Sequence, residues 1–79
     1  MKAKVFVTLK TSILDPQGKT IVGALRSLGY DEVHDVRQGK YFELDVVAET
    51  ASQAKALVTD VADKLLANPV IESYRVEVE

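Results

Sequence analysis

The chain has 79 residues, of which 47% are hydrophobic, with a net charge of −2, one histidine and no cysteine. This composition excludes disulfides and thiolate zinc sites, and no basic stripe or membrane-length apolar run is present. We therefore expect one domain over residues 1–79, no nucleic-acid partner, no membrane partner and, without a recognisable targeting segment, a cytoplasmic location. Because a core this small retains only about 3–5 kcal/mol, association with other subunits is the expected further support.

The chain opens with a strand, because apolar and polar residues alternate from Ala3 to Leu9. Phe6 is the exception, since it is an aromatic residue on the otherwise polar face. Isolated exposed aromatic residues are common, but Phe6 is where we look for a second contact surface.

A short amphipathic helix follows this strand. Asp15 is a good N-cap, and Pro16 suits the first helical turn, where its missing N–H costs nothing. Gly29 offers a left-handed C-terminal cap. The apolar face has i, i+4 and i+7 spacing and consists of Ile21, Leu25 and Leu28.

Residues 33–38 and 40–48 predict two strands that meet in a hairpin around Gly39. The second of these strands alternates strictly. In the first, Val33 and Val36 are out of phase with each other, so either the strand starts after Val33 or a bulge intervenes.

A second helix begins with a capping-box pattern, in which Thr50 is the cap and Gln53 reaches back. Asn68-Pro69 ends this helix. Its apolar stripe consists of Ala54, Leu57, Val58, Val61 and Leu65.

The last strand alternates, with Tyr74, Val76 and Val78 pointing inward. The element order is therefore β-α-β-β-α-β. It predicts an α+β fold, a two-layer sandwich in which two helices cover one face of a four-stranded antiparallel sheet.

No set of residues carries catalytic or metal-binding chemistry. His34 lies among acidic residues without a second histidine at ligand spacing, which favours a solvated loop over a metal site. Gly18-Lys19-Thr20 resembles the end of a phosphate-binding loop, but Ile13 stands where that loop needs its first glycine. No serine or threonine has a base placed by the sequence. We expect no catalytic residue, no metal and no cofactor.

Arg37 and Lys40 flank the predicted hairpin tip. A solvated turn is the commonest use of such cations. The alternative is a cationic finger that pairs with carboxylates or phosphates on a partner.

Three segments carry a family resemblance. The first is Leu9-Lys10 followed by Ile13-Leu14-Asp15-Pro16-Gln17-Gly18, and the second is Val36-Arg37-Gln38-Gly39-Lys40 with Glu43 close behind. The third is Leu65-Leu66-Ala67-Asn68-Pro69-Val70-Ile71-Glu72. Each motif alone is modest, but all three occur in order and at matching spacing. Over essentially its whole length, the chain resembles the small (PurS) subunit of phosphoribosylformylglycinamidine synthase.

This resemblance implies a non-catalytic accessory subunit in purine biosynthesis. In that family a large subunit performs the ATP-dependent amidation of formylglycinamide ribonucleotide, and a glutaminase subunit releases ammonia from glutamine. The small subunit forms dimers or higher oligomers that bridge the two and support ammonia transfer. The chain would then have no catalytic set of its own, yet belong to a glutamine-dependent carbon–nitrogen ligase complex.

With a partner implied, the cationic turn and the first helix start become candidate contact sites. The candidate partner-binding residues are Asp15, Gln17, Gly18, Arg37, Gly39 and Lys40. The candidate contacts between copies of the chain are Phe6, Tyr41 and Val47.

The same order of elements fits an alternative, an ACT-like small-molecule sensor that would bind an amino acid near Leu14–Gly18. The Asn68-Pro69 and hairpin motifs argue against it, as does the absence of an attached enzyme domain to regulate. An enzyme in its own right is the least favoured reading.

Overall fold

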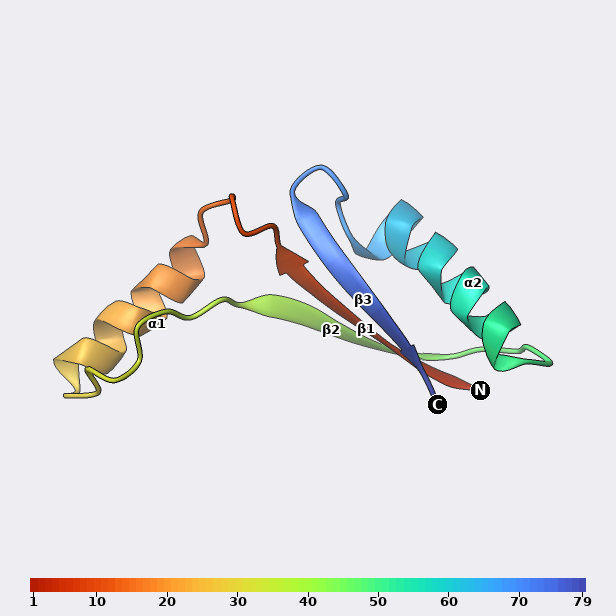
Figure 1. Cartoon of the computed structure of the whole chain (residues 1–79), viewed down its shortest axis with the longest axis horizontal. Coiled ribbons are helices and arrows are strands. Elements are labelled where there is room, and N and C mark those ends of the chain that lie inside the picture. Colours follow the sequence, from red (N-terminus) through yellow and green to blue (C-terminus); the bar gives the residue numbers. More distant parts are fainter.

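Three strands and two helices make up the fold, which a computed structural model describes over all 79 residues (Figure 1). The second helix continues into a π-helical turn, η1. The predicted α+β class is confirmed. In chain order the elements are β1 (Lys2–Leu9), α1 (Pro16–Ser27), β2 (Gly39–Asp45), α2 (Ala51–Val61), η1 (Ala62–Leu66) and β3 (Glu72–Val78).

The sheet is antiparallel with the order β2-β1-β3, so β1 is its central strand. Its register places Val5 opposite Phe42 on one side and opposite Val76 on the other. Because successive side chains point to opposite faces, the alternation in β1 gives the sheet one apolar face and one mainly polar face. The first strand predicted from the sequence is the one that pairs with a neighbour on both edges.

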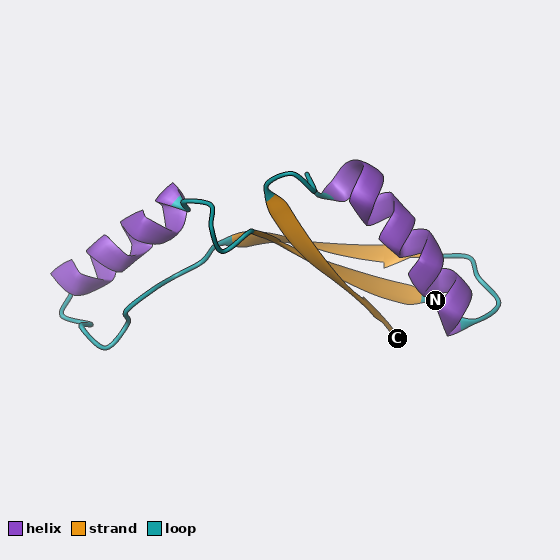
Figure 2. Cartoon of the chain, turned by 45° about the horizontal axis from the view of Figure 1, so that its top comes forward, coloured by secondary structure: helices purple, strands orange, loops and turns teal.

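The apolar face of the sheet and α2 enclose the hydrophobic core (Figure 2). The largest side chains that are fully removed from solvent are Val5, Val7 and Val58. Most core side chains are small, which lets α2 lie close to the sheet. The buried cluster consists of Ala3, Val5, Val7, Val46, Val58, Ala62 and Ala67.

The N-terminus of α2 has the predicted capping contacts. The Thr50 hydroxyl accepts a hydrogen bond from the backbone N–H of Gln53 at 3.1 Å. The Gln53 side-chain oxygen accepts one from the backbone N–H of Glu49, also at 3.1 Å. The return contact therefore falls one residue before the cap, and both backbone donors are satisfied.

The buried side of α2 and η1 differs from the predicted stripe. Val58 is buried, but Leu57 and Leu65 are 48% and 79% exposed. Near the end, the N–H of Ala67 donates to the carbonyl of Ala62 at 2.9 Å, a span of five residues. This wider turn breaks the 3.6-residue period, so the two alanines enter the core and Leu65 points to solvent.

Helix α1 lies apart from the sheet, which corrects the prediction that both helices cover one face. Only α2 packs on the strands, and the molecule measures 50 × 25 × 14 Å (Figures 1 and 2). We call residues 10–38, which comprise α1 and its two connections, the arm. Because α1 has no sheet beneath it, much of its apolar face remains accessible to solvent.

The C-terminus of α1 is the predicted glycine cap. Gly29 has a φ of +94°, and its N–H donates to the carbonyl of Arg26 at 3.0 Å. The N–H of Tyr30 donates to the carbonyl of Leu25 at 2.9 Å. Together these bonds form a Schellman motif, which ends the helix.

The predicted strand over 33–38 does not form, and neither does the hairpin around Gly39. The sheet has three strands, and β2 starts at Gly39 and pairs directly with β1. The preceding residues run back along α1 (Figure 2). There the carbonyl of Val36 lies so close to Gly18 that a Cβ on the glycine would collide with it. The segment is extended, but it packs on the helix and has no strand partner.

Replacement of Val58 by alanine should lower the free energy of unfolding by about 1.5–3 kcal/mol, because it removes buried apolar surface and leaves a cavity. Leu65→Ala should cost less than about 0.5 kcal/mol, since Leu65 is 79% exposed. Urea denaturation at one fixed protein concentration measures both values. Equal losses in the two variants would contradict the placement of η1.

Candidate functional site

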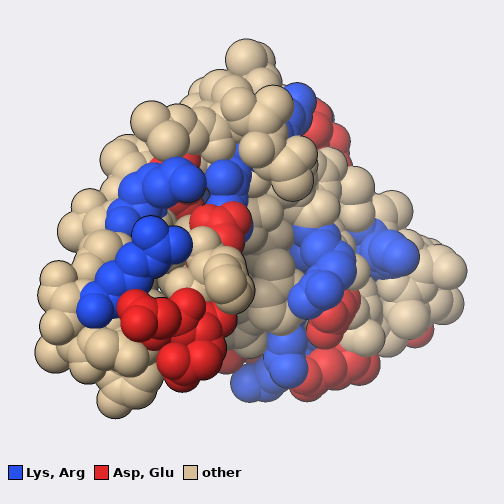
Figure 3. Space-filling view, turned by 60° about the vertical axis from the view of Figure 1, so that its left-hand side comes forward, with Lys and Arg blue, Asp and Glu red and all other residues tan.

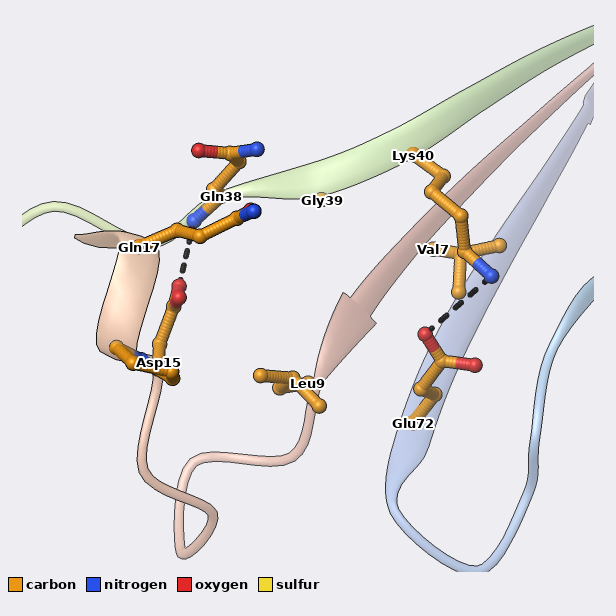
Figure 4. Close-up of a pocket in the computed structure, with 9 residues that line it drawn as sticks. Val7, Leu9, Asp15, Gln17, Gln38, Gly39, Lys40 and Glu72 are labelled. Atoms are coloured by element: carbon orange, nitrogen blue, oxygen red, sulfur yellow. Dashed lines mark hydrogen bonds and ion pairs between the residues drawn. The ribbon is translucent and has the colours of Figure 1, made fainter.

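A cleft of about 330 Å³ opens where the arm joins the sheet (Figure 4). We call it the junction cleft. It brings together four of the six candidate partner-binding residues, while Gly18 and Arg37 stand outside its lining. The lining residues are Val7, Leu9, Asp15, Pro16, Gln17, Gln38, Gly39, Lys40 and Glu72.

Asp15 holds two parts of the chain together at one side of the cleft. It is only 4% exposed, and its Oδ1 accepts a hydrogen bond from the N–H of Gly18 at 2.9 Å, as an N-cap does. Its Oδ2 accepts a second, from the N–H of Gln38 at 2.7 Å (Figure 4). The bond from Gln38, and then that from Gly18, lower the pKa of Asp15 below its usual value. The predicted helix cap therefore also fastens the segment that leads into β2.

Gly18 and Gly39 lie where backbone segments approach most closely. A Cβ on Gly18 would collide with the carbonyl of Val36, and one on Gly39 would collide with the carbonyl of Val7. Both glycines therefore permit close packing of the chain on itself at the junction.

Arg37 lies in the return connection and not at a hairpin tip. Its Nη2 donates to the carbonyl oxygens of Lys10 at 2.9 Å and Ile13 at 3.0 Å, and lies 3.5 Å from that of Leu9. Bonds from a charged donor are stronger than neutral ones. In this structure the guanidinium thus holds the connection between β1 and α1, and does not project as a free finger.

Lys40 also has partners within the chain. Its Nζ lies 3.5 Å from a carboxylate oxygen of Glu72 (Figure 4). It also donates to the carbonyl of Leu66 at 3.3 Å. The other oxygen of Glu72 accepts a hydrogen bond from the N–H of Asn68 at 2.7 Å. Lys40 therefore links the start of β2 to the start of β3 and to the end of η1.

Five lining residues were not among the candidates, and the two with polar side chains are Gln38 and Glu72. Glu72 had a usable signal, because it is a charged residue at an inward position of the alternation that includes Tyr74. Gln38 acts through its backbone N–H, for which no side-chain signal exists. The side-chain amides of Gln17 and Gln38 make no hydrogen bond within the chain, and both lie at the cleft (Figure 4). Both amides therefore have unused hydrogen-bonding capacity.

The open face of the sheet carries two of the three candidate contacts between copies. The rings of Phe6 and Tyr41 lie 5.1 Å apart between centroids, and the guanidinium of Arg75 lies 4.5 Å above the Phe6 ring. Val47, which is fully exposed, follows the end of β2 and is not part of this group. The structure therefore offers an aromatic and cationic surface in the middle of the uncovered face.

The remaining surface chemistry is mixed. Basic and acidic side chains lie interspersed over the face that Figure 3 shows. His34 is exposed, and no group of three or more potential ligand side chains is placed to hold a metal ion. None of the helices combines the length and the apolar character needed to span a membrane. The chemistry that the cleft offers is hydrogen bonding through amides and ion pairing.

Comparison with known proteins gives one family. The sequence model of PurS, described as phosphoribosylformylglycinamidine (FGAM) synthase, matches residues 2–79. The phosphoribosylformylglycinamidine synthase subunit PurS of Bacillus subtilis strain 168 is 53% identical over 78 residues, which are 99% of this chain and 92% of that protein.

Solved structures agree with this match. Methanocaldococcus jannaschii PurS, described as one of the subunits of formylglycinamide ribonucleotide amidotransferase in the purine biosynthetic pathway, superposes with a TM-score of 0.89 at 40% identity. The match covers 99% of this chain and 94% of that one. A chain in the structure of PurLQS from Thermotoga maritima has a TM-score of 0.88 at 36% identity, covering 96% of this chain and 93% of that one.

The lowered pKa of Asp15 predicts a loss of stability in acid. A carboxyl group whose folded-state pKa is depressed stabilises the fold at pH values above its ordinary pKa of 3.8, and this contribution disappears as the pH falls through the folded value. Asp15→Asn keeps an acceptor for Gly18 but has no charge to titrate. Its Tm should be several degrees lower than that of the parent at neutral pH, and the difference should shrink below about pH 4.

The pKa of Glu79 is lowered as well, by its hydrogen bond and ion pair with Lys4, so the comparison is made in a Glu79→Gln background. Thermal melts between pH 3 and pH 7 measure the effect. A constant Tm difference across this range would show that the Asp15 charge does not stabilise the fold.

Proposed function

The chain belongs to the PurS family of phosphoribosylformylglycinamidine synthase, and from this membership we propose that it bridges the glutaminase and large synthetase subunits of that enzyme. In this role it is a non-catalytic subunit that supports ammonia transfer for the ATP-dependent amidation of formylglycinamide ribonucleotide. The observation that carries the proposal is the match, over 96% of the chain, to a chain in the Thermotoga maritima PurLQS structure. We further propose that residues 1–79 form a single domain and that the protein is cytoplasmic.

The shape of the molecule supports a bridging role. A chain with extents of 50 × 25 × 14 Å presents two separate surfaces, the sheet with α2 at one end and the arm at the other (Figure 1). A compact sandwich of the same length would bury the arm against the sheet. The separation lets one small subunit touch two larger ones.

The junction cleft is the part of this surface that we assign to a partner subunit. Asp15, Gly39 and Lys40 shape it through contacts within the chain, whereas the Gln17 amide is free to bind. A polar segment of the partner that offers backbone N–H and C=O groups fits this lining, because an amide side chain both donates and accepts hydrogen bonds.

The alternative of an ACT-like sensor is not favoured. The family match extends over residues 2–79 and leaves no segment to a different family. The sheet also has three strands, where the predicted sandwich has four.

Reconstitution tests the bridging function. The isolated chain should show neither glutaminase nor ATP-hydrolysing activity, because its residues offer no nucleophile with a positioned base. Added to the purified large and glutaminase subunits, it should raise glutamine-driven synthesis, while synthesis from supplied ammonia by the large subunit proceeds without it. Measurable turnover by the chain alone, or glutamine-driven synthesis that is the same with and without it, would refute the proposal. Tight binding of a free amino acid to the isolated chain, measured by calorimetry, would instead support the ACT-like sensor.

We also propose that the chain works as a homodimer or larger assembly, in which a second copy covers the apolar face of α1 rather than the expected contacts Phe6, Tyr41 and Val47. On α1 and its connection, Leu14 and Leu28 are 67% and 73% exposed, and Ile21 is 37% exposed. Full burial of an exposed side chain of this size contributes about 1.5–3 kcal/mol, and the contribution of Ile21 is smaller because it is already mostly covered. We assign this surface to a second copy because a core this small needs additional buried surface. Every copy also carries the same exposed apolar side chains, so two copies can bury them against each other.

Leu28→Lys should therefore shift the chain toward monomers without unfolding the protomer, since Leu28 is already 73% exposed within it. Lys19→Ala, a change at an exposed position of the same helix, should leave the assembly unchanged. Sedimentation velocity at micromolar concentration measures the outcome. A parent chain that sediments as a stable monomer, or a Leu28→Lys variant with unchanged mass, would contradict this arrangement.

A further inference from the structure

Within the arm, two connections join α1 to the sheet, one leaving β1 through residues 10–15 and one returning to β2 at residues 36–38. Since α1 does not pack on the sheet, contacts at these connections set the direction in which the arm points. The junction is therefore the place where the geometry of the whole molecule is decided.

Each connection supplies one side chain that binds the backbone of the other. Asp15, in the outgoing connection, accepts the N–H of Gln38 at 2.7 Å. Arg37, in the return connection, donates to the carbonyls of Lys10 and Ile13 at 2.9 and 3.0 Å. The two links run in opposite senses, carboxylate to N–H and guanidinium to C=O, and both are charge-assisted.

Close backbone contacts lie on both sides of these links. On the arm side the carbonyl of Val36 lies against Gly18, and on the sheet side the carbonyl of Val7 lies against Gly39. A rotation of α1 relative to the strands would have to break these charged links and separate Gly18 from the carbonyl of Val36. The junction is thus built to hold one orientation.

We propose that Asp15 and Arg37 form a clamp that sets the direction of the arm, and that Arg37 is a positioning residue for glutamine-driven synthesis. This inference rests on the proposed bridging function. It assigns to Arg37 an action through the arm and not through direct contact with a partner. Because a misplacement of about 1 Å can reduce a rate about a hundredfold, a loosened arm should impair the coupling between the subunits that it touches.

Arg37→Met tests this role, because methionine keeps an unbranched side chain but removes every donor and the charge. Glutamine-driven synthesis by the reconstituted complex should fall by about tenfold to a hundredfold, while synthesis from supplied ammonia is unchanged. The matched control is Arg26→Met, which removes the same charge from an exposed position on α1 that makes no hydrogen bond through its side chain. It should behave like the parent.

Direction of the arm is measured independently of activity. The chain has no cysteine, so Lys19→Cys and Lys55→Cys, both at exposed helix positions, allow spin labels to be attached at one site in α1 and one in α2. Labelled chain is diluted with unlabelled chain so that each assembly carries one labelled copy. Pulsed electron resonance should give a narrow distance distribution for the parent and for Arg26→Met, and a broader or shifted one for Arg37→Met.

The two readouts separate the possible failures. An unchanged distance distribution in Arg37→Met would overturn the clamp. A broadened distribution with undiminished glutamine-driven synthesis would overturn the positioning role of Arg37. If the parent itself supports no glutamine-driven synthesis, the proposed bridging function fails, whereas the clamp is still judged by the distances.

Discussion

The rest of the structure depends on how one buried carboxylate is shared. Asp15 caps the first turn of α1 with one oxygen and holds the N–H of Gln38 with the other, at 2.9 and 2.7 Å. A helix cap alone would start α1 without placing it. The second bond ties that start to the entrance of β2, so the helix, the return segment and the sheet meet at a fixed point. The low exposure of Asp15 and its lowered pKa both reflect this double use.

The distinctive feature of the fold is that helix α1 does not pack on the sheet. In a compact sandwich α1 would cover the sheet beside α2, and its leucines would complete the core. Here α2 and η1 cover the apolar face, with small residues such as Ala54 and Ala62 that let them lie close. The apolar surface of α1 is left exposed. A protomer that is incomplete in this way suits a subunit whose work is to hold other subunits together, because its exposed surface is where binding free energy is available.

The charged residues near the junction bind partners within the chain and so contribute to its fold. Arg37 and Lys40 are the kind of basic pair that a sequence presents as a solvated turn or a contact for a partner. In the fold each cation donates to backbone carbonyls, and Lys40 also pairs with Glu72. A charge near a surface often contributes little to stability, but a charged donor that binds carbonyls of a distant segment fixes the position of that segment. Any effect of these residues on the complex would then act through geometry.

The sequence by itself determined the local elements and the family. Asp15 and Gly29 mark the ends of α1, and alternation marks β1 and β3, because caps and faces depend on residues only a few positions apart. The tertiary structure decided the rest. The residues of 33–38 favour an extended backbone, but this preference does not specify a strand partner. The segment packs on α1 instead, and the sheet has three strands. The spacing of Leu65 could not reveal a π-helical turn that turns it outward. The junction cleft joins residues far apart in the chain through backbone contacts, which side-chain patterns do not encode.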